Sequence, residues 1–245
     1  MTSSAFVPAH LLVAYLIFVQ PVRGVLQYRA LTKSLASGNE SARLHFYRKF
    51  VLRWWASVFL LGFVLILLPF PLGATLREMG LRVPRNWMIV GSVFLGVIVA
   101  ELIRLVIWRK PTVRAKLLKK LERFRALLPV TKVERHSYLG FAITAGVCEE
   151  LVYRGFLLFY FLQIFQDTIP FEWGIVFSAV VFGLAHCYQG LRGVLATGLI
   201  GIFFAYLYWY TGSLFPSMVT HALMDLRFLF IRDQGINQTS SSQTV

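Results

Sequence analysis

Long apolar segments dominate this sequence and constrain its fold more than any other feature. The 245 residues are 57% hydrophobic and only 15% charged, whereas a soluble domain of this length would keep more charge on its surface. The apolar residues fall in blocks of roughly 20, the length of helix that crosses the hydrocarbon core of a bilayer. The sequence therefore predicts an all-α fold, a polytopic membrane helix bundle.

About seven of these blocks are expected to span the membrane. The predicted spans are 7–27, 52–72, 87–108, 138–161, 172–187, 190–210 and 213–231. Pro21 lies within the first span and predicts a kink there. A basic amphipathic helix is predicted at about 111–128, where apolar residues recur at helical spacing among Lys and Arg. It is expected to lie on the cytosolic membrane surface, with a solvated connector as the alternative.

The basic residues concentrate in the loops between the apolar blocks. The formal net charge is +14, from 25 Lys and Arg against 11 Asp and Glu. This distribution favours membrane topology and contact with anionic lipid over binding to nucleic acid. Basic and non-basic loops alternate, so the positive-inside rule places the N-terminus outside and the C-terminus in the cytosol. We expect an integral membrane protein, of the cell or inner membrane in a prokaryote.

Ionisable residues inside apolar spans are costly, so each needs a partner or a function. Glu101 and Arg104 are three residues apart and are predicted to form a structural ion pair. Glu150 and Arg154, four apart on one helical face, are predicted to pair in the same way. This leaves Glu149 with no local cation. Two adjacent carboxylates in a low dielectric do not both ionise readily, and such a group is suited to take and return a proton.

Two histidines are also placed in or beside apolar spans. His186 lies at the end of the fifth predicted span, where a lone histidine is usually a packing residue. His221 and Asp225 are four apart in the seventh, so the carboxylate can orient the imidazole. The predicted directions of the spans bring these residues and Glu149 into a polar cavity that opens toward the cytosol.

These residues form three motifs in order along the chain. They are Glu-Glu-x-x-x-Arg at 149–154, Phe-x-x-x-His at 182–186 and His-x-x-x-Asp at 221–225. In this the chain resembles the CAAX-processing and bacteriocin-processing intramembrane proteases, also called the abortive infection family. The resemblance covers about 127–231 and includes Glu134; before that, only Met79-Gly80-Leu81-Arg82 is similar. We therefore divide the chain into N-terminal transmembrane helices with a basic linker (1–126), a protease core of four transmembrane helices (127–231) and a disordered polar tail (232–245).

The resemblance implies an endopeptidase that hydrolyses a peptide bond of a membrane-associated protein or peptide. It implies that Glu149 and His186 hold and activate the attacking water, and that His221 and Asp225 stabilise the oxyanion. The predicted ion pair of the first motif would support the catalytic carboxylate. Prenylated CAAX proteins, bacteriocin leaders and other membrane-anchored proteins are all compatible substrates.

Metal dependence is a separate question, because this family is often labelled metalloprotease. Zinc is possible, with His186, His221 and Glu149 as candidate ligands. The helical His-Glu-x-x-His signature is absent, which favours a glutamate mechanism with no required cofactor. Asp225 stands where better-understood relatives have Asn. An ionised Asp cannot donate to an oxyanion, so Asp225 is expected to be protonated, to orient a cationic His221, or to ligate a metal.

Three other interpretations stay open at this point. The chain could be a non-catalytic membrane partner, such as an immunity protein or scaffold that keeps the motifs for binding. It could instead be a transporter or proton relay, because intramembrane Glu and His also mark such pathways. Cys148 and Cys187 adjoin Glu149 and His186, but small packing residues are a better interpretation than a thiol nucleophile.

Overall fold

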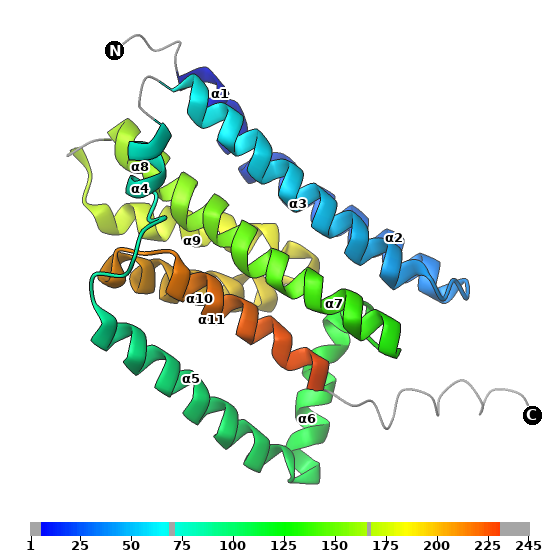
Figure 1. The fold of residues 1–245 in the computed structure, drawn as a ribbon. Coiled ribbons are helices and arrows are strands. Elements are labelled where there is room, and N and C mark those ends of the chain that lie inside the picture. Colours follow the sequence, from blue (N-terminus) through cyan, green and yellow to red (C-terminus); the bar gives the residue numbers. More distant parts are fainter. Residues whose placement is uncertain (1–5, 69–71, 166–167, 231–245) are drawn as a thin grey trace, which may run out of the picture.

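The computed structural model describes residues 6–68, 72–165 and 168–230, and these ranges form a bundle of helices without strands (Figure 1). The first long helix consists of α1 (Val7–Ala14), a π-helical turn (Tyr15–Val19) and α2 (Gln20–Ala36). It continues well beyond the predicted end at residue 27. Pro21 lies two residues after the end of the π-helical turn, which takes up the irregularity that a proline imposes on a helix. The predicted polar tail, 232–245, lies outside the described residues.

The rest of the N-terminal half contains four more helices. They are α3 (Ala42–Leu67), α4 (Leu72–Glu78), α5 (Trp87–Trp108) and α6 (Pro111–Leu121). The short α4 falls in a segment expected to be a loop. The predicted amphipathic helix is present as α6, and a 3-10 segment, Glu122–Leu127, continues it. Within α5, Arg104 and Glu101 form the predicted ion pair.

The C-terminal half begins with one long helical segment. It runs through α7 (Lys132–Thr144), two π-helical stretches (Ala145–Glu149 and Leu151–Leu157) and α8 (Leu158–Phe165). The helices α9 (Phe171–Ala185), α10 (Leu191–Thr211) and α11 (Phe215–Leu226) follow, with a 3-10 turn after α11. In Figure 1, α7 and α9–α11 form the centre of the bundle, with α1–α3 along one side and α5 along another.

Within the described ranges, four helices are long and apolar enough to cross a membrane. They cover Val7–Ala36, Ala42–Leu67, Trp87–Ile107 and Leu191–Thr211. The three other predicted spans appear as the helical segment from α7 to α8, as α9 and as α11. With 15 and 12 residues, α9 and α11 are shorter than the roughly 20 residues that a perpendicular span requires. The predicted count of seven spans is therefore not confirmed.

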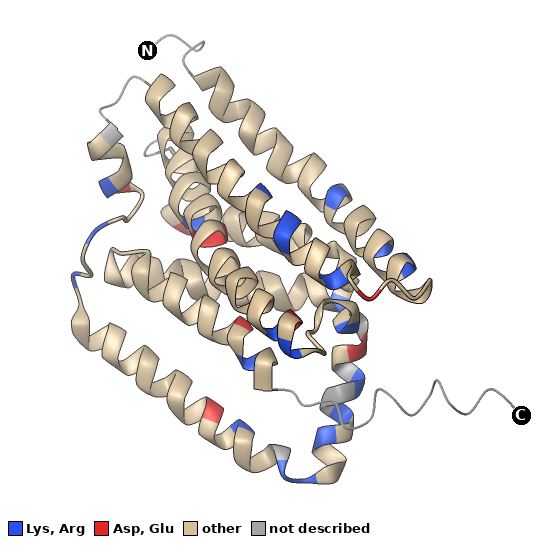
Figure 2. Cartoon of the chain, turned by 45° about the vertical axis from the view of Figure 1, so that its right-hand side comes forward, with Lys and Arg blue, Asp and Glu red and all other residues tan. Residues whose placement is uncertain are grey.

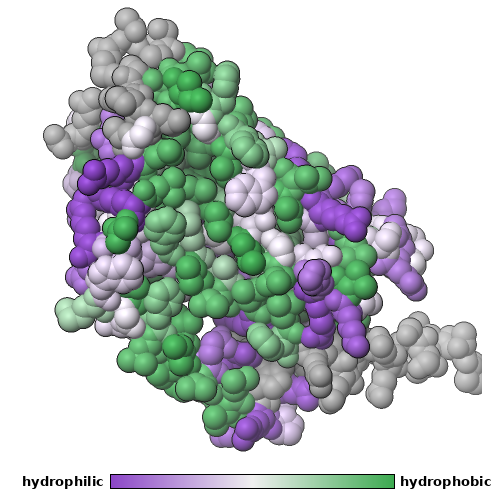
Figure 3. All heavy atoms as spheres, viewed as in Figure 1, coloured by the Kyte–Doolittle hydropathy of each residue, from purple (hydrophilic) through white to green (hydrophobic). Residues whose placement is uncertain are grey.

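The surface has the polarity that a membrane protein needs. Large apolar side chains such as Phe59, Ile98 and Leu199 are exposed on the outside of the bundle. Figure 3 shows an apolar band across the middle of one face, with hydrophilic residues toward the ends of the helices. Most Lys and Arg gather at the end formed by the α2–α3 connection and α6 (Figure 2), here called the basic end.

The connection between α4 and α5 forms hydrogen bonds that stabilise the end of the bundle opposite the basic end. Gly80 has a φ of +90°, and its carbonyl accepts a hydrogen bond from the Leu214 N–H at 2.9 Å. Arg82 Nε donates to the Gly212 carbonyl at 2.6 Å. A Cβ at Gly80 would lie 2.3 Å from the Tyr208 ring. Both the backbone angle and the close approach therefore require glycine, and the contacts join this stretch to the α10–α11 turn.

Replacing Gly80 with alanine should destabilise the protein more than the same change at Gly38. Both glycines have a positive φ, which costs an alanine about 1–2 kcal/mol. Only at Gly80 does the new Cβ clash, because Gly38 has open space around it; the clash should cost about 1–3 kcal/mol more. Thermal unfolding of both variants in detergent measures the difference, and equal losses would show that the contact with Tyr208 does not matter.

Candidate active site

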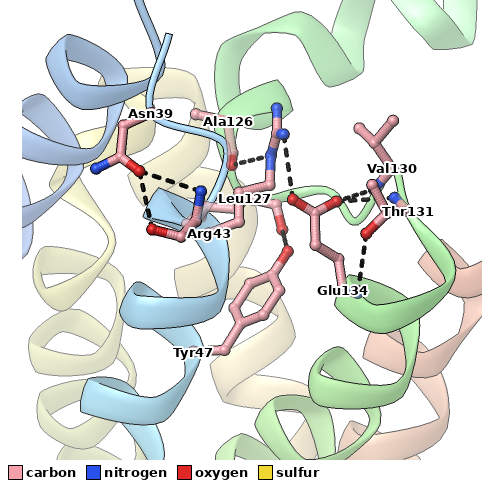
Figure 4. Close-up of polar contacts among 9 residues, drawn as sticks. Asn39, Arg43, Tyr47, Ala126, Leu127, Val130, Thr131 and Glu134 are labelled. Atoms are coloured by element: carbon pink, nitrogen blue, oxygen red, sulfur yellow. Dashed lines mark hydrogen bonds and ion pairs between the residues drawn. The ribbon is translucent and has the colours of Figure 1, made fainter. Parts of the chain in front are cut away.

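A capping box fixes the start of α7 (Figure 4). Glu134 accepts hydrogen bonds from the backbone N–H groups of Val130 and Thr131, at 2.7 and 2.9 Å. The Thr131 hydroxyl accepts in return from the Glu134 N–H at 3.1 Å. These bonds satisfy N–H groups that the first turn of a helix leaves unpaired, so this helix has a defined starting point.

Side chains of α3 hold the same end of α7 in place (Figure 4). Arg43 reaches Glu134 at 3.5 Å and donates from Nε to the Ala126 carbonyl at 3.0 Å. The Tyr47 hydroxyl donates to the Leu127 carbonyl at 2.8 Å. The position of α7 relative to α3 is thereby set before the helix reaches the two adjacent glutamates.

The helix widens where the glutamates occur. Glu149 ends the first π-helical stretch and Glu150 separates it from the second. Such widened turns are rare and often accompany functional sites, because they change the direction of side chains and free backbone groups. Here the Tyr153 carbonyl accepts a hydrogen bond from Ser178 of α9 at 2.7 Å. A Cβ at Gly146 would lie 2.7 Å from the Ala222 nitrogen, so α11 packs directly against this part of the helix.

Glu150 and Arg154 form the predicted ion pair at the centre of the bundle. Arg154 Nη1 donates to Glu150 Oε1 at 2.8 Å, and both side chains are fully buried. Buried charges are tolerated only when paired and hydrogen-bonded. The same Glu150 oxygen lies 2.8 Å from His221 Nδ1, so one carboxylate serves an arginine from its own helix and a histidine from α11.

His221 is hydrogen-bonded to Glu150, a partner that the sequence did not predict, and Asp225 also lies beside its ring, as their spacing indicated. With Nδ1–H donating to Glu150, the Nε2 edge faces Glu149 and Asp225, at 3.9 and 3.8 Å from their nearest carboxylate oxygens. These distances exceed hydrogen-bond range, so Nε2 lies near two carboxylates without a direct bond to either. The hydrogen-bond partner belongs to another helix, so spacing within α11 could not indicate it.

Phe182 connects the three motifs through its ring. The Arg154 guanidinium lies 4.0 Å from the ring centroid, in a cation–π contact. The rings of His186 and His221 pack edge-on at 4.7 and 6.0 Å. Phe204, fully buried on α10, stacks on His221 at 5.0 Å. The motif included Phe182, but no local pattern in the sequence singles out Phe204.

His186 is fixed by its own helix at the end of α9. Its Nδ1 lies 2.8 Å from the Phe182 carbonyl. A carbonyl only accepts hydrogen bonds, so Nδ1 carries the proton and Nε2 is left as an acceptor. His186 and Glu149 both line one cavity of about 720 Å³. The structure therefore places His186 and Glu149 on the wall of the same cavity, whereas the His221 ring lies close to the carboxylates of Glu149, Glu150 and Asp225.

The N-terminal helices supply the opposite wall of this cavity, which the sequence did not predict. Lining residues come from α1, α2 and α3 as well as from the segment that holds the three motifs. Toward one end the lining is apolar, with Leu11, Leu60 and Phe63. Its volume falls in the range of pockets that enclose small organic ligands, so an apolar chain can enter beside Glu149.

Within the described ranges, no group of three or more His, Cys, Asp or Glu side chains is arranged to hold a metal ion. The candidate zinc ligands His186, His221 and Glu149 are not brought together as such a group.

The fold and site define a helical membrane protein with a buried Glu–Arg–His cluster beside an apolar cavity. Residues 134–227 match the family described as Rce1-like type II CAAX prenyl endopeptidases. This segment therefore belongs to the CAAX-protease-like family, as the three motifs indicated, and it contains all six predicted site residues. No curated protein and no solved structure gives a significant match. The family is one of proteases, which supports an enzymatic role.

The two adjacent glutamates should differ sharply in their effect on stability. Glu150→Gln leaves Arg154 buried without its counter-charge, which should cost about 3 kcal/mol of unfolding free energy. Glu149→Gln removes no ion pair with Arg or Lys among the described residues, so its stability should stay close to wild type. Chemical denaturation of the detergent-solubilised variants tests this. Equal losses would contradict the separate roles, and recovery of stability in Glu150→Gln/Arg154→Met would support them.

Proposed function

We propose that this protein is an intramembrane endopeptidase that hydrolyses a peptide bond of a membrane-associated substrate with a water activated by Glu149. One observation carries the proposal: Glu149 lines the cavity, while the neighbouring Glu150 is committed to Arg154 and His221. A carboxylate without a fixed partner, beside a space that a substrate can enter, is available as a general base.

In the proposed reaction, Glu149 and the Nε2 atom of His186 hold a water between them. Glu149 takes a proton as the water attacks the substrate carbonyl carbon, which forms a tetrahedral intermediate. The same carboxyl group then returns the proton to the leaving amine, so that one water is consumed and two new chain ends appear. Electrostatic stabilisation of the oxyanion is the other large contribution that such a site must provide.

We assign oxyanion stabilisation to His221 with support from Asp225. In its cationic form, His221 can donate from Nε2 to the oxyanion while Nδ1–H stays bonded to Glu150. Asp225, 3.8 Å from Nε2, flanks that cation. Glu150 and Arg154 hold the imidazole in place and do not themselves touch the substrate. The proposed mechanism needs no metal.

The shape of the cavity also supports a substrate class. The apolar lining next to Glu149 suits a lipid-modified or strongly apolar segment, and CAAX prenyl proteins named in the family description are of this kind. We propose that the basic end faces the cytosol, because basic loops stay on that side of the membrane. The N-terminus would then be outside.

Glu149→Gln should abolish the new protein termini that the wild-type protein creates in membranes. Loss of a general base lowers the rate by about 10²–10⁴-fold. Mass spectrometry of N- and C-termini, at matched expression, measures the effect. Cys148→Ala is the matched control, because it alters the adjacent buried residue and leaves the carboxylate in place. Identical termini in wild-type and Glu149→Gln membranes would favour a non-catalytic binding partner.

Chelation should leave the activity unchanged. Incubating wild-type membranes with EDTA or 1,10-phenanthroline should leave the rate of Glu149-dependent cleavage within about twofold of the untreated sample, because proton transfer by a carboxylate needs no metal. The measurement is a time course of the Glu149-dependent termini. Inhibition that added zinc reverses would contradict the proposed mechanism.

A further inference from the structure

The cavity beside Glu149 has a polar end as well as an apolar one. Gln20, Arg23 and Gln27 recur at helical spacing along α2 and all line it, and Arg53 of α3 lines it too. Both arginines carry a positive charge. A cavity that is mostly apolar is thus lined by two like charges.

Neither arginine has a counter-charge in the part of the chain that the structure describes. The ion pairs found there involve other residues. Arg23 donates to the Tyr15 hydroxyl, and Arg53 Nε donates to the Lys49 carbonyl at 3.1 Å. A guanidinium has five N–H donors, so each side chain is held by one bond and keeps further donors for another molecule.

These two cations lie deeper along their helices than the other basic residues. No Lys or Arg comes before Arg23 in the first long helix, and none follows Arg53 in α3. Charges placed so far along an apolar helix are costly and usually serve a function. Side chains that merely reached for lipid headgroups would point out of the bundle, whereas both of these line the cavity.

The turn of α2 that carries Arg23 packs directly against the end of α9 that carries His186. Cys187 Sγ lies 3.4 Å from the Pro21 carbonyl. A Cβ on Gly24 would lie 3.3 Å from the Ala185 carbonyl. The turn of α2 that carries Arg23 therefore lies beside the end of α9 that carries His186.

We propose that Arg23 and Arg53 together bind the free C-terminal carboxylate of the substrate peptide. This inference rests on the proposed function and identifies the substrate group that these two residues recognise. An anion bound by both guanidinium groups supplies the counter-charge that neither has among the described residues, and the paired N–H donors of arginine match a carboxylate. Within a peptide backbone only the C-terminus carries such a group. The substrate then lies with its apolar part against α1 and α3 and its C-terminus at the arginines.

Binding of two matched peptides tests this inference without relying on catalysis. The probe is a fluorescein-labelled peptide with an S-farnesyl cysteine followed by three aliphatic residues, made with either a C-terminal carboxylate or a carboxamide. The receptor is the Glu149→Gln protein in phosphatidylcholine nanodiscs. We expect the carboxylate form to bind at least about tenfold more tightly. Adding Arg23→Gln or Arg53→Gln should reduce this ratio to near one and leave carboxamide binding largely unchanged.

Arg29→Gln and Arg48→Gln are the controls, since both arginines are exposed on the same two helices and neither lines the cavity. They should preserve the ratio. Equal binding of the two peptides, no binding of either, or a ratio that survives both cavity variants would overturn the inference. The inference would also be overturned if peptide binding depended on added phosphatidylglycerol and the cavity variants lost only that dependence. The arginines would then bind lipid phosphate. If wild-type membranes still show Glu149-dependent termini, the proposed endopeptidase activity stands. Any of these outcomes then rejects only the carboxylate-binding site.

Discussion

The buried ion pair between Glu150 and Arg154 is the interaction on which the rest of the site depends. Both groups are cut off from water, so neither is stable there without the other. The pair is surrounded by side chains that it also arranges: Phe182 covers the guanidinium, and His221 bonds the carboxylate. Because Glu150 is occupied in this way, the adjacent Glu149 is left to face the cavity. Two neighbouring residues of one chemical type thereby acquire different roles.

The cavity is assembled from two parts of the chain, one inside the segment that matches the protease family and one outside it. The segment that matches the protease family supplies Glu149 and His186. The helices α1–α3, which lie outside that match, supply the apolar lining and the two arginines. Under the proposed function, the matched core carries the chemistry, and the N-terminal helices select what reaches it. Variation in those helices would change the substrate without touching the reacting groups.

Contacts within a single helix could be predicted from sequence spacing, and contacts between helices could not. The pairs Glu101–Arg104 and Glu150–Arg154 were both found as expected, because residues three or four apart share a helical face. The same reasoning placed Asp225 beside His221, where it lies at 3.8 Å, but it could not predict the hydrogen bond from His221 to Glu150 on another helix. The short helix α4 was not foreseen. The helices α9 and α11 were predicted, but they are shorter than the roughly 20 residues that a perpendicular span requires.

The sequence motifs name candidate site residues, but they do not record the geometry around them. The three motifs pointed to all six polar residues, but the aromatic support from Phe204 and the cavity wall from α1–α3 depend on packing that no local pattern records. The π-helical turns around the glutamates were equally invisible, because they arise where Ser178 and Gly146 allow neighbouring helices to approach.

A double-mutant cycle on the free energy of unfolding tests most directly whether Glu150 is the residue that holds His221. The cycle combines Glu150→Gln with His221→Gln, and a parallel cycle combines Asp225→Asn with His221→Gln. A hydrogen bond at 2.8 Å to a buried carboxylate predicts a coupling energy of about 2 kcal/mol in the first cycle. The coupling energy in the second cycle should be only a few tenths of a kcal/mol, because Asp225 makes no direct hydrogen bond to the imidazole. A strong coupling to Asp225 together with a negligible one to Glu150 would contradict the arrangement on which the proposed mechanism is built.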